Sequence, residues 1–379
     1  MSSKQPPLPA DEKAHRVALA ALGKASRVKM AFGLLIGFLL LFLVLRYVNV
    51  FALLSVLQEN LRTPRGIALA LLAGVAYLLA WSVRGIRWKL FLNPIGKVSV
   101  LKAIALYQIA VFINFLLPVQ GGEVVKCFLL RRSTNIAVSA SLPTVMLDKT
   151  MDLMPVLVIL AIVPLLGLEM GIVLRVLLTG VGVVCCSLLF IILLAILKRE
   201  AAIGLLNKLT GLLPRAIAGK VEGFASGFVD SLLRGISQPK IFASAIMLTA
   251  VAVIFDGLYA MLVFWAIGFP IPFGTATFGY ITYKMYHVLP TPPAGIGSAE
   301  AVGLLVFSGL LHLPALQVTA MFVVSHIWAS LLIVVTGLAS LSALGLTISD
   351  ITRLRTIQND VTEEDTFRPD EKERAALRE

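Results

Sequence analysis

Two apolar stretches of this chain are interrupted in the same way, by prolines and glycines that are followed by a carboxylate. The first break, 118–122, precedes Glu123, and the second, 290–297, precedes Glu300. Paired helix breaks in two halves of a membrane protein indicate the binding site of a transporter. Backbone freed at membrane depth must be buried in protein or line a wet cavity. The sequence therefore predicts a polar interior between the two breaks, whose residues are Pro118, Gly121, Gly122, Pro290, Pro292, Pro293, Gly295 and Gly297.

Ionisable side chains inside apolar sequence are the next candidates for function. A charge near the centre of a membrane helix costs about 2.5–3.5 kcal/mol on insertion scales, so it is expected to face protein or water. Asp256 and His326, each alone in its own apolar run, are expected to form hydrogen bonds between helices. The candidate substrate-binding or transport residues are Asn114, Glu123, Lys126, Asp148, Lys149, Asp152, Lys284, His287 and Glu300.

The residues alone leave two readings for most of these side chains. Asp148 and Asp152 share one helical face and could hold a cationic head group or relay protons. Alternatively, Lys149 forms a local ion pair with Asp152 and only neutralises the helix. Glu123 and Glu300 either contact substrate or stabilise the positive end of a returning helix.

The approach to the second break raises the same choice. Lys284 and His287 lie one helical turn apart among several tyrosines, which is typical either of a lined cavity or of an aromatic belt at the membrane interface. Asn114, one turn before the first break, either faces the cavity or satisfies backbone groups that the proline frees.

Composition restricts the class of protein. The chain is 58% hydrophobic and 14% charged, far from an ordinary soluble domain, so we expect a multi-pass membrane protein. Its net charge of +12 indicates contact with anionic lipid and positive loops on the inner side, not nucleic acid. The three cysteines and four histidines have no metal-ligand spacing, and no nucleotide-binding loop or catalytic motif is present. We therefore expect no metal, no cofactor and no catalytic residues.

Charge also orients the chain. The basic tail 1–29 and the tail 346–379, expected to be disordered, are both predicted to be cytoplasmic, and the chain is expected in the cell (inner) membrane. Arg84 and Arg87, with the lysines that follow, are expected to mark a cytoplasmic loop. An outer amphipathic segment is expected at 51–62, and an amphipathic cytoplasmic linker at 198–240. Full spans are expected near 30–48, 66–83, 140–166, 172–197, 241–268 and 315–343.

The two broken elements are expected to be re-entrant. If the first crossed fully, Lys126, Arg131 and Arg132 would lie outside, against the positive-inside rule. The predicted fold is an all-α polytopic membrane protein with about six full spans and two re-entrant helix pairs. Within a transmembrane domain at 30–345, the halves 30–166 and 172–343 form an inverted repeat, the architecture of alternating access.

Three motifs resemble the lysylphosphatidylglycerol synthase transmembrane (flippase-like) family, which includes hopanoid-associated membrane proteins. They are the run from Asn114 to Lys126, the run from Leu147 to Asp152, and the run from Leu289 to Glu300. The resemblance covers roughly 30–345 and implies movement of lipids or lipid-linked groups between leaflets. Lysines stand at 126 and 149 where the family often has arginine, so bidentate phosphate contacts are lost there.

The leading hypothesis is a lipid transporter in which a polar head group enters the cavity while its tails stay in the bilayer. Membrane lipids with anionic or lipid-linked head groups are the expected partners, and lipid-biosynthesis enzymes are candidate protein partners. The alternatives are a membrane-embedded subunit or partner of a lipid-modifying transferase, and a scaffold whose polar residues only join helices.

Overall fold

A computed structural model describes residues 49–116, 121–162, 239–284 and 292–346, with a few isolated positions before 49 and between 172 and 179. Every regular element of these residues is helical. Several predicted features lie outside the described residues: the break residues Pro118 and Pro290, His287, most of the first and fourth spans, the linker 198–240 and both tails.

Within the described residues, three helices are long and apolar enough to cross a membrane: α3 (Pro64–Leu92), α10 (Pro239–Ala266) and α13 (Ala315–Ala343). At about 1.5 Å per residue, each exceeds the roughly 30 Å of a hydrocarbon core. α3 starts sharply, because Thr63 accepts a hydrogen bond from the Gly66 amide at 2.9 Å and Pro64 occupies the first turn.

The helix that forms the second predicted span, 66–83, extends further than the sequence indicates. The expectation that it stops near 83 and that Arg84 and Arg87 lie in a loop is wrong, since α3 continues to Leu92 and buries both side chains. Carboxylates on other helices keep these two arginines inside the fold, so their charge does not mark the membrane boundary. The amphipathic segment, by contrast, forms α2 (Val50–Leu61) close to its expected bounds.

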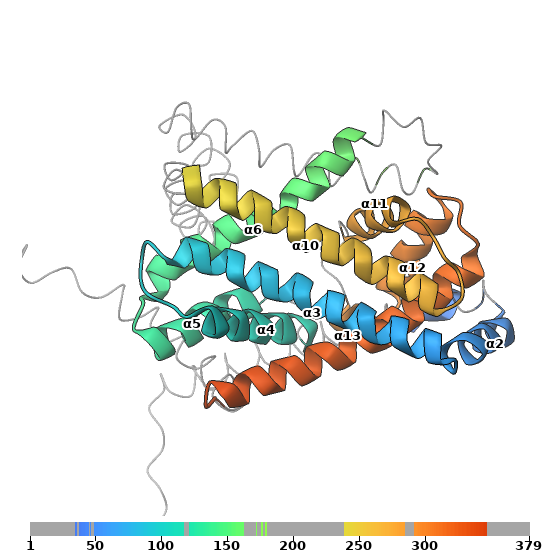
Figure 1. Ribbon diagram of the computed structural model, residues 1–379, viewed down its shortest axis with the longest axis horizontal. Coiled ribbons are helices and arrows are strands. Elements are labelled where there is room, and N and C mark those ends of the chain that lie inside the picture. The colour runs from blue at the N-terminus through green and yellow to red at the C-terminus, as the bar shows by residue number, and fades with distance from the viewer. Residues whose placement is uncertain are drawn as a thin grey trace, which may run out of the picture.

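The first broken element is a pair of half-helices, α4 (Val100–Leu116) and α5 (Gly122–Thr134), that lie side by side (Figure 1). Their contact is very close, because a Cβ atom on Gly122 would lie 2.1 Å from the Ala110 carbonyl oxygen. The side-chain oxygen of Asn114 accepts a hydrogen bond from the Gly122 amide at 2.8 Å. Asn114 thus supplies a partner for backbone at the start of the returning helix.

The second broken element is less regular. α11 (Phe273–Lys284) leads toward the break, and after it come a 3₁₀ turn, Pro293–Gly295, the short helix α12 (Ser298–Gly303) and the π-helical segment η4 (Leu304–Ser308). Gly295 and Gly297 have φ values of 69° and 74°, a conformation that glycine adopts without steric cost.

The long helices bring the two broken elements into one molecule. α3 and α10 pack antiparallel, with Tyr77 against Tyr259 and Arg87 bonded to Thr249. α6 (Val138–Ile162) packs against α3, α10 and α11, and α13 packs against α4. Figure 1 shows α4 and α5 toward one end of the long helices and α11 and α12 toward the other.

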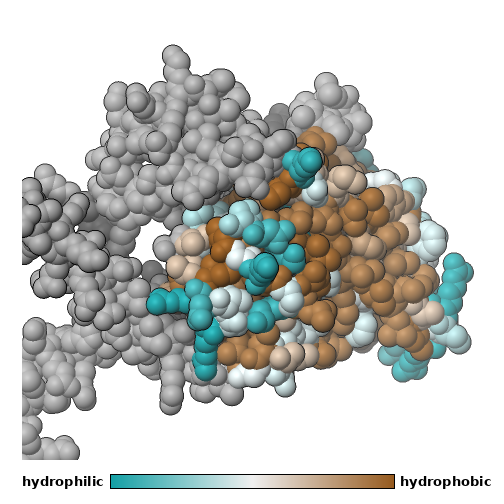
Figure 2. All heavy atoms as spheres, turned by 60° about the vertical axis from the view of Figure 1, so that its left-hand side comes forward, coloured by the Kyte–Doolittle hydropathy of each residue, from teal (hydrophilic) through white to brown (hydrophobic). Residues whose placement is uncertain are grey.

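The surface of the described part suits a lipid environment. Large apolar side chains are exposed along α3, α10 and α13, among them Leu71, Met247 and Ile327. On the face in Figure 2, a broad hydrophobic area separates hydrophilic groups at the two ends of the described part. A band of this kind is typical of helices that face lipid tails.

Candidate functional site

Charged side chains from α3 and α6 meet inside the fold. Arg87 donates to the Asp148 carboxylate at 2.8 Å and to the Asp152 carboxylate at 2.7 Å. It also donates to the Asp148 carbonyl at 3.1 Å and to Thr249 of α10 at 2.9 Å. Tyr107 of α4 donates to the second oxygen of Asp148 at 3.2 Å. One guanidinium therefore connects α3, α6 and α10, and both aspartates have an arginine partner from another helix.

A second arginine extends this network to the second broken element. Arg84 contacts Asp256 of α10 at 2.6 Å and lies 3.6 Å from Asp152. The other oxygen of Asp256 accepts from Lys284 of α11 at 2.7 Å. The ammonium of Lys284 also lies 5.5 Å from the ring centre of Trp81, within cation–π range. Asp256 therefore joins three helices, as the prediction of interhelical bonding required.

The first break has its own charge cluster. Glu123, in the first turn of α5, lies 2.6 Å from Lys126 and 2.8 Å from Lys149 of α6. The Lys126 ammonium lies 4.6 Å and 4.4 Å from the ring centres of Trp88 and Tyr107. Two cations hold this carboxylate, so it does more than stabilise a helix end.

The second break has a matching pair. Glu300, in the first turn of α12, lies 2.7 Å from the Nδ1 atom of His326 on α13. These two residues are 26 positions apart, the same separation as Glu123 and Lys149. The other oxygen of Glu300 is buried and has no hydrogen-bond partner among the described residues.

Burial divides the candidate residues into two groups. Arg87, Asp148 and Lys126 have side chains that are at most 1% exposed, so they cannot contact a substrate in this state. The side chains of Lys149, Asp152 and Lys284 are 39%, 29% and 23% exposed. The buried charged side chains therefore hold the partly exposed ones in position.

The joined clusters carry an excess of positive charge. Among the described residues, four carboxylates face five cationic side chains, which are Arg84, Arg87, Lys126, Lys149 and Lys284. Because two of the lysines are partly open, this arrangement can attract an anionic group. No group of three metal-ligating side chains occurs in the part of the chain that the structure describes.

Sequence reasoning missed Arg84 and Arg87, although they lie three residues apart on one helix face, the spacing that would place both toward the same partners. It also missed Trp81, Trp88 and Tyr107 as ring partners of the cations. Ring contacts with side chains of other elements depend on tertiary packing, which the spacing along one helix does not reveal.

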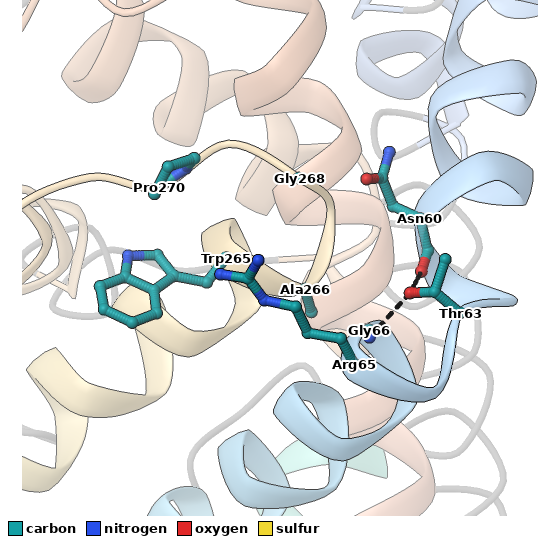
Figure 3. Close-up of a pocket in the computed structure, with 8 residues that line it drawn as sticks. All are labelled: Asn60, Thr63, Arg65, Gly66, Trp265, Ala266, Gly268 and Pro270. Atoms are coloured by element: carbon teal, nitrogen blue, oxygen red, sulfur yellow. Dashed lines mark hydrogen bonds between the residues drawn. The ribbon is translucent and has the colours of Figure 1, made fainter.

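A separate cavity of about 260 Å³ lies at the other end of α3, between the α2–α3 turn and the α10–α11 turn. In Figure 3, the Arg65 side chain extends across this space toward Ala266 and Trp265. None of the charged residues of the network lines the cavity, so the two features are distinct.

The described part of the chain is helical, with helices long and apolar enough to span a membrane, two broken elements and buried ion pairs. These features define a polytopic membrane protein with a charged interior. The chain belongs to the family described as the lysylphosphatidylglycerol synthase transmembrane region, whose model matches residues 30–337.

The chain is also similar to two individual proteins. It is 24% identical to the glycosyltransferase AglD of Haloferax volcanii over 85% of this chain and 55% of that protein. It is 27% identical to a UPF0104 membrane protein of Pyrococcus horikoshii over 63% of this chain and 75% of that protein. The chain thus spans about half the length of the glycosyltransferase relative. No solved structure matches significantly.

Proposed function

We propose that this protein moves a lipid with an anionic head group between the leaflets of the membrane. One observation supports this most: a series of ion pairs, with nitrogen–oxygen distances of 2.6–3.6 Å, runs from the first broken element, through α6, α3 and α10, to the second. It passes from Glu123 to Lys149, continues one turn along α6 to Asp152, and ends through Arg84 and Asp256 at Lys284. A polar route of this kind suits a head group whose tails remain in lipid.

The open cations are the proposed head-group ligands. Lys149 and Lys284 would each exchange a protein carboxylate for a lipid phosphate or another anionic group. Asp152, partly open, would compensate for the change in charge. Lys126 is sealed between two rings, so we assign it to positioning Glu123.

The proposed architecture is an inverted repeat with about six full spans and two re-entrant pairs. Three features support it: the antiparallel packing of α3 on α10, the location of the helices of the two broken elements toward opposite ends, and the shared 26-residue spacing of the carboxylate–cation pairs. Rocking of one half against the other would change which side is open. We place the protein in the cell membrane with both termini cytoplasmic.

The alternative function is that of a membrane-embedded subunit or partner of a lipid-modifying transferase. The name of the Haloferax relative favours it, since that protein is called a glycosyltransferase and this chain matches 55% of it. In that case lipid-biosynthesis enzymes would be the protein partners.

The experiment is a leaflet-exchange assay in liposomes that contain the purified full chain and fluorescent phosphatidylglycerol or fluorescent phosphatidylcholine. We expect faster exchange of the anionic probe with the wild type. A Lys149→Gln, Lys284→Gln double variant should lose it while its thermal unfolding stays close to that of the wild type. Lys97→Gln is the matched control, because Lys97 is an exposed lysine in the loop after α3.

Two results would overturn the proposal. The first is that the wild type exchanges neither the anionic nor the zwitterionic probe. The second is that the double variant exchanges the anionic probe at the wild-type rate. Mass spectrometry of the same liposomes, after addition of a nucleotide-sugar donor, would reveal a new lipid product if the transferase alternative holds.

A further inference from the structure

The two broken elements carry equivalent carboxylate–cation pairs that differ in one chemical property. In both, the carboxylate lies in the first turn of the returning helix and the cation lies 26 residues later on the next long helix. The cation is Lys149 in the first half and His326 in the second. Lysine stays charged throughout the physiological range, whereas an ordinary imidazole gains or loses its proton near pH 6.5.

The surroundings of the two carboxylates also differ, since the first has more permanently charged partners than the second. Glu123 has a second lysine, Lys126, three residues further along α5. The equivalent position after Glu300 is Gly303, where a Cβ atom would lie 2.3 Å from the Phe322 ring. The second half therefore has no room for another cation at this position. Among the described residues, protonated His326 is the side chain that compensates the charge of Glu300.

The other titratable groups near this pair have partners of their own. The Tyr259 hydroxyl of α10 donates to the Ser325 carbonyl at 2.9 Å, and the Tyr283 ring of α11 packs on Phe322. In the described residues, no further charged side chain lies within ion-pair distance of Glu300 or His326. The helices that pack on α13 and η4 also carry titratable or charged groups, among them Tyr77 on α3, Tyr107 on α4, Asp256 and Tyr259 on α10, and Tyr280, Tyr283 and Lys284 on α11.

We propose that the Glu300–His326 pair is a proton-binding site that controls the second broken element, while the Glu123–Lys149 pair is a permanently charged clamp. With one proton, the pair is an imidazolium and a carboxylate and is neutral overall. When His326, whose side chain is 20% exposed, releases that proton to water, a buried carboxylate is left without compensation. Hydration of Glu300, and hence opening of the second element, relieves that state.

Only the consequence for lipid transport rests on the proposed function. If the protein moves lipid, release and uptake of a proton at the second element supply a driving force from a proton gradient. The proton-binding step itself is a property of the pair and can be measured without any lipid substrate.

The first experiment follows the histidine side chains by NMR in the ¹⁵N-histidine-labelled full chain, in lipid nanodiscs, from pH 5 to 9. The chain has four histidines, and the signal lost in a His326→Lys variant identifies His326. We expect this signal to respond to pH in the wild type and to respond differently in a Glu300→Gln variant, since the carboxylate that compensates the imidazolium would then be absent. A midpoint unaffected by Glu300→Gln, or no titration in this range, would overturn the proposal.

The second experiment measures leaflet exchange of fluorescent phosphatidylglycerol as a function of pH. Whatever its absolute rate, a His326→Lys variant should lose the pH response of the wild type between pH 5.5 and 8. A Lys149→His variant should acquire an additional pH response in the same range. A His326→Lys profile that parallels the wild type would contradict the proposal.

The two experiments separate the two proposals. If the wild type moves no probe lipid but His326 titrates with Glu300, the proposed function fails and the proton site stands. If the wild type moves lipid and His326 does not titrate, only the proton site fails.

Discussion

Arg87 illustrates how the interior charges depend on one another at the scale of single residues. Its guanidinium makes four hydrogen bonds, to Asp148, Asp152 and Thr249, and is almost fully buried. Replacing one partner of such a group leaves the others charged and unpaired in a low-dielectric interior. The resulting loss of stability exceeds the net stabilisation that the ion pair provides. The partly exposed lysines Lys149 and Lys284 differ, because water can solvate the carboxylate partners that remain when a lysine is replaced.

The first prediction concerns this difference. We expect Arg87→Met to lower the free energy of unfolding by about 3–5 kcal/mol, because Asp148 would be buried without its cation. An Arg87→Met, Asp148→Asn double variant should recover part of that loss. The measurement is thermal unfolding of the purified protein in detergent.

Lys149→Met is the matched control, since its ammonium is more than one-third exposed and Glu123 keeps Lys126. We expect a much smaller change in the unfolding midpoint. An equal loss in both variants would show that burial does not separate the two groups of charges.

At the scale of elements, the first break depends on a close contact between two half-helices. The Gly122 amide bonds to Asn114, and the absence of a side chain at Gly122 lets α5 approach the Ala110 carbonyl. A side chain at this point would force the half-helices apart and move Glu123 away from Lys149. The glycine thus keeps the charges of the first break in register with α6.

The second prediction tests this contact. Gly122→Ala should destabilise the protein by about 1–3 kcal/mol, as overpacking does in a tight interior. Gly274→Ala is the control, because a Cβ atom there meets nothing within 4 Å. Denaturation of both variants measures the difference, and equal midpoints would argue against close packing of α4 on α5.

At the scale of the whole molecule, the antiparallel pair α3 and α10 forms the centre of the described part. Aromatic contacts such as Tyr77 on Tyr259 and ion pairs such as Arg84 to Asp256 lie along the same interface. The two broken elements lie toward opposite ends of this pair (Figure 1). If the long helices cross the membrane, the turns that follow the two elements should lie on opposite sides.

The third prediction is therefore topological. Single cysteines introduced at Ala137, after α5, and at His312, after η4, should react with an impermeant reagent from opposite sides of the membrane. Both positions are exposed, and the native cysteines would be replaced first. Reaction of both positions from the same side would exclude the inverted repeat.

Much of the architecture could be predicted because it depends on local chemistry. Apolar length predicted α10 and α13 almost to their ends, and proline with glycine predicted both breaks. The same reasoning misplaced the end of α3, since it treats every charge as exposed. Arg84 and Arg87 are charges that other helices satisfy.

The sequence by itself determined that this is a membrane protein with two interrupted helices and a set of intramembrane charges, because hydrophobicity and backbone constraints act within each segment. Only the tertiary structure decided which charges pair, which are sealed and which stay open. Asp148 pairs with Arg87, Glu123 with Lys149, and Glu300 with His326, and in each pair the two residues lie on different helices. The physical reason is that the energy of a buried charge depends on partners that packing brings within about 3 Å, and one segment alone does not contain them.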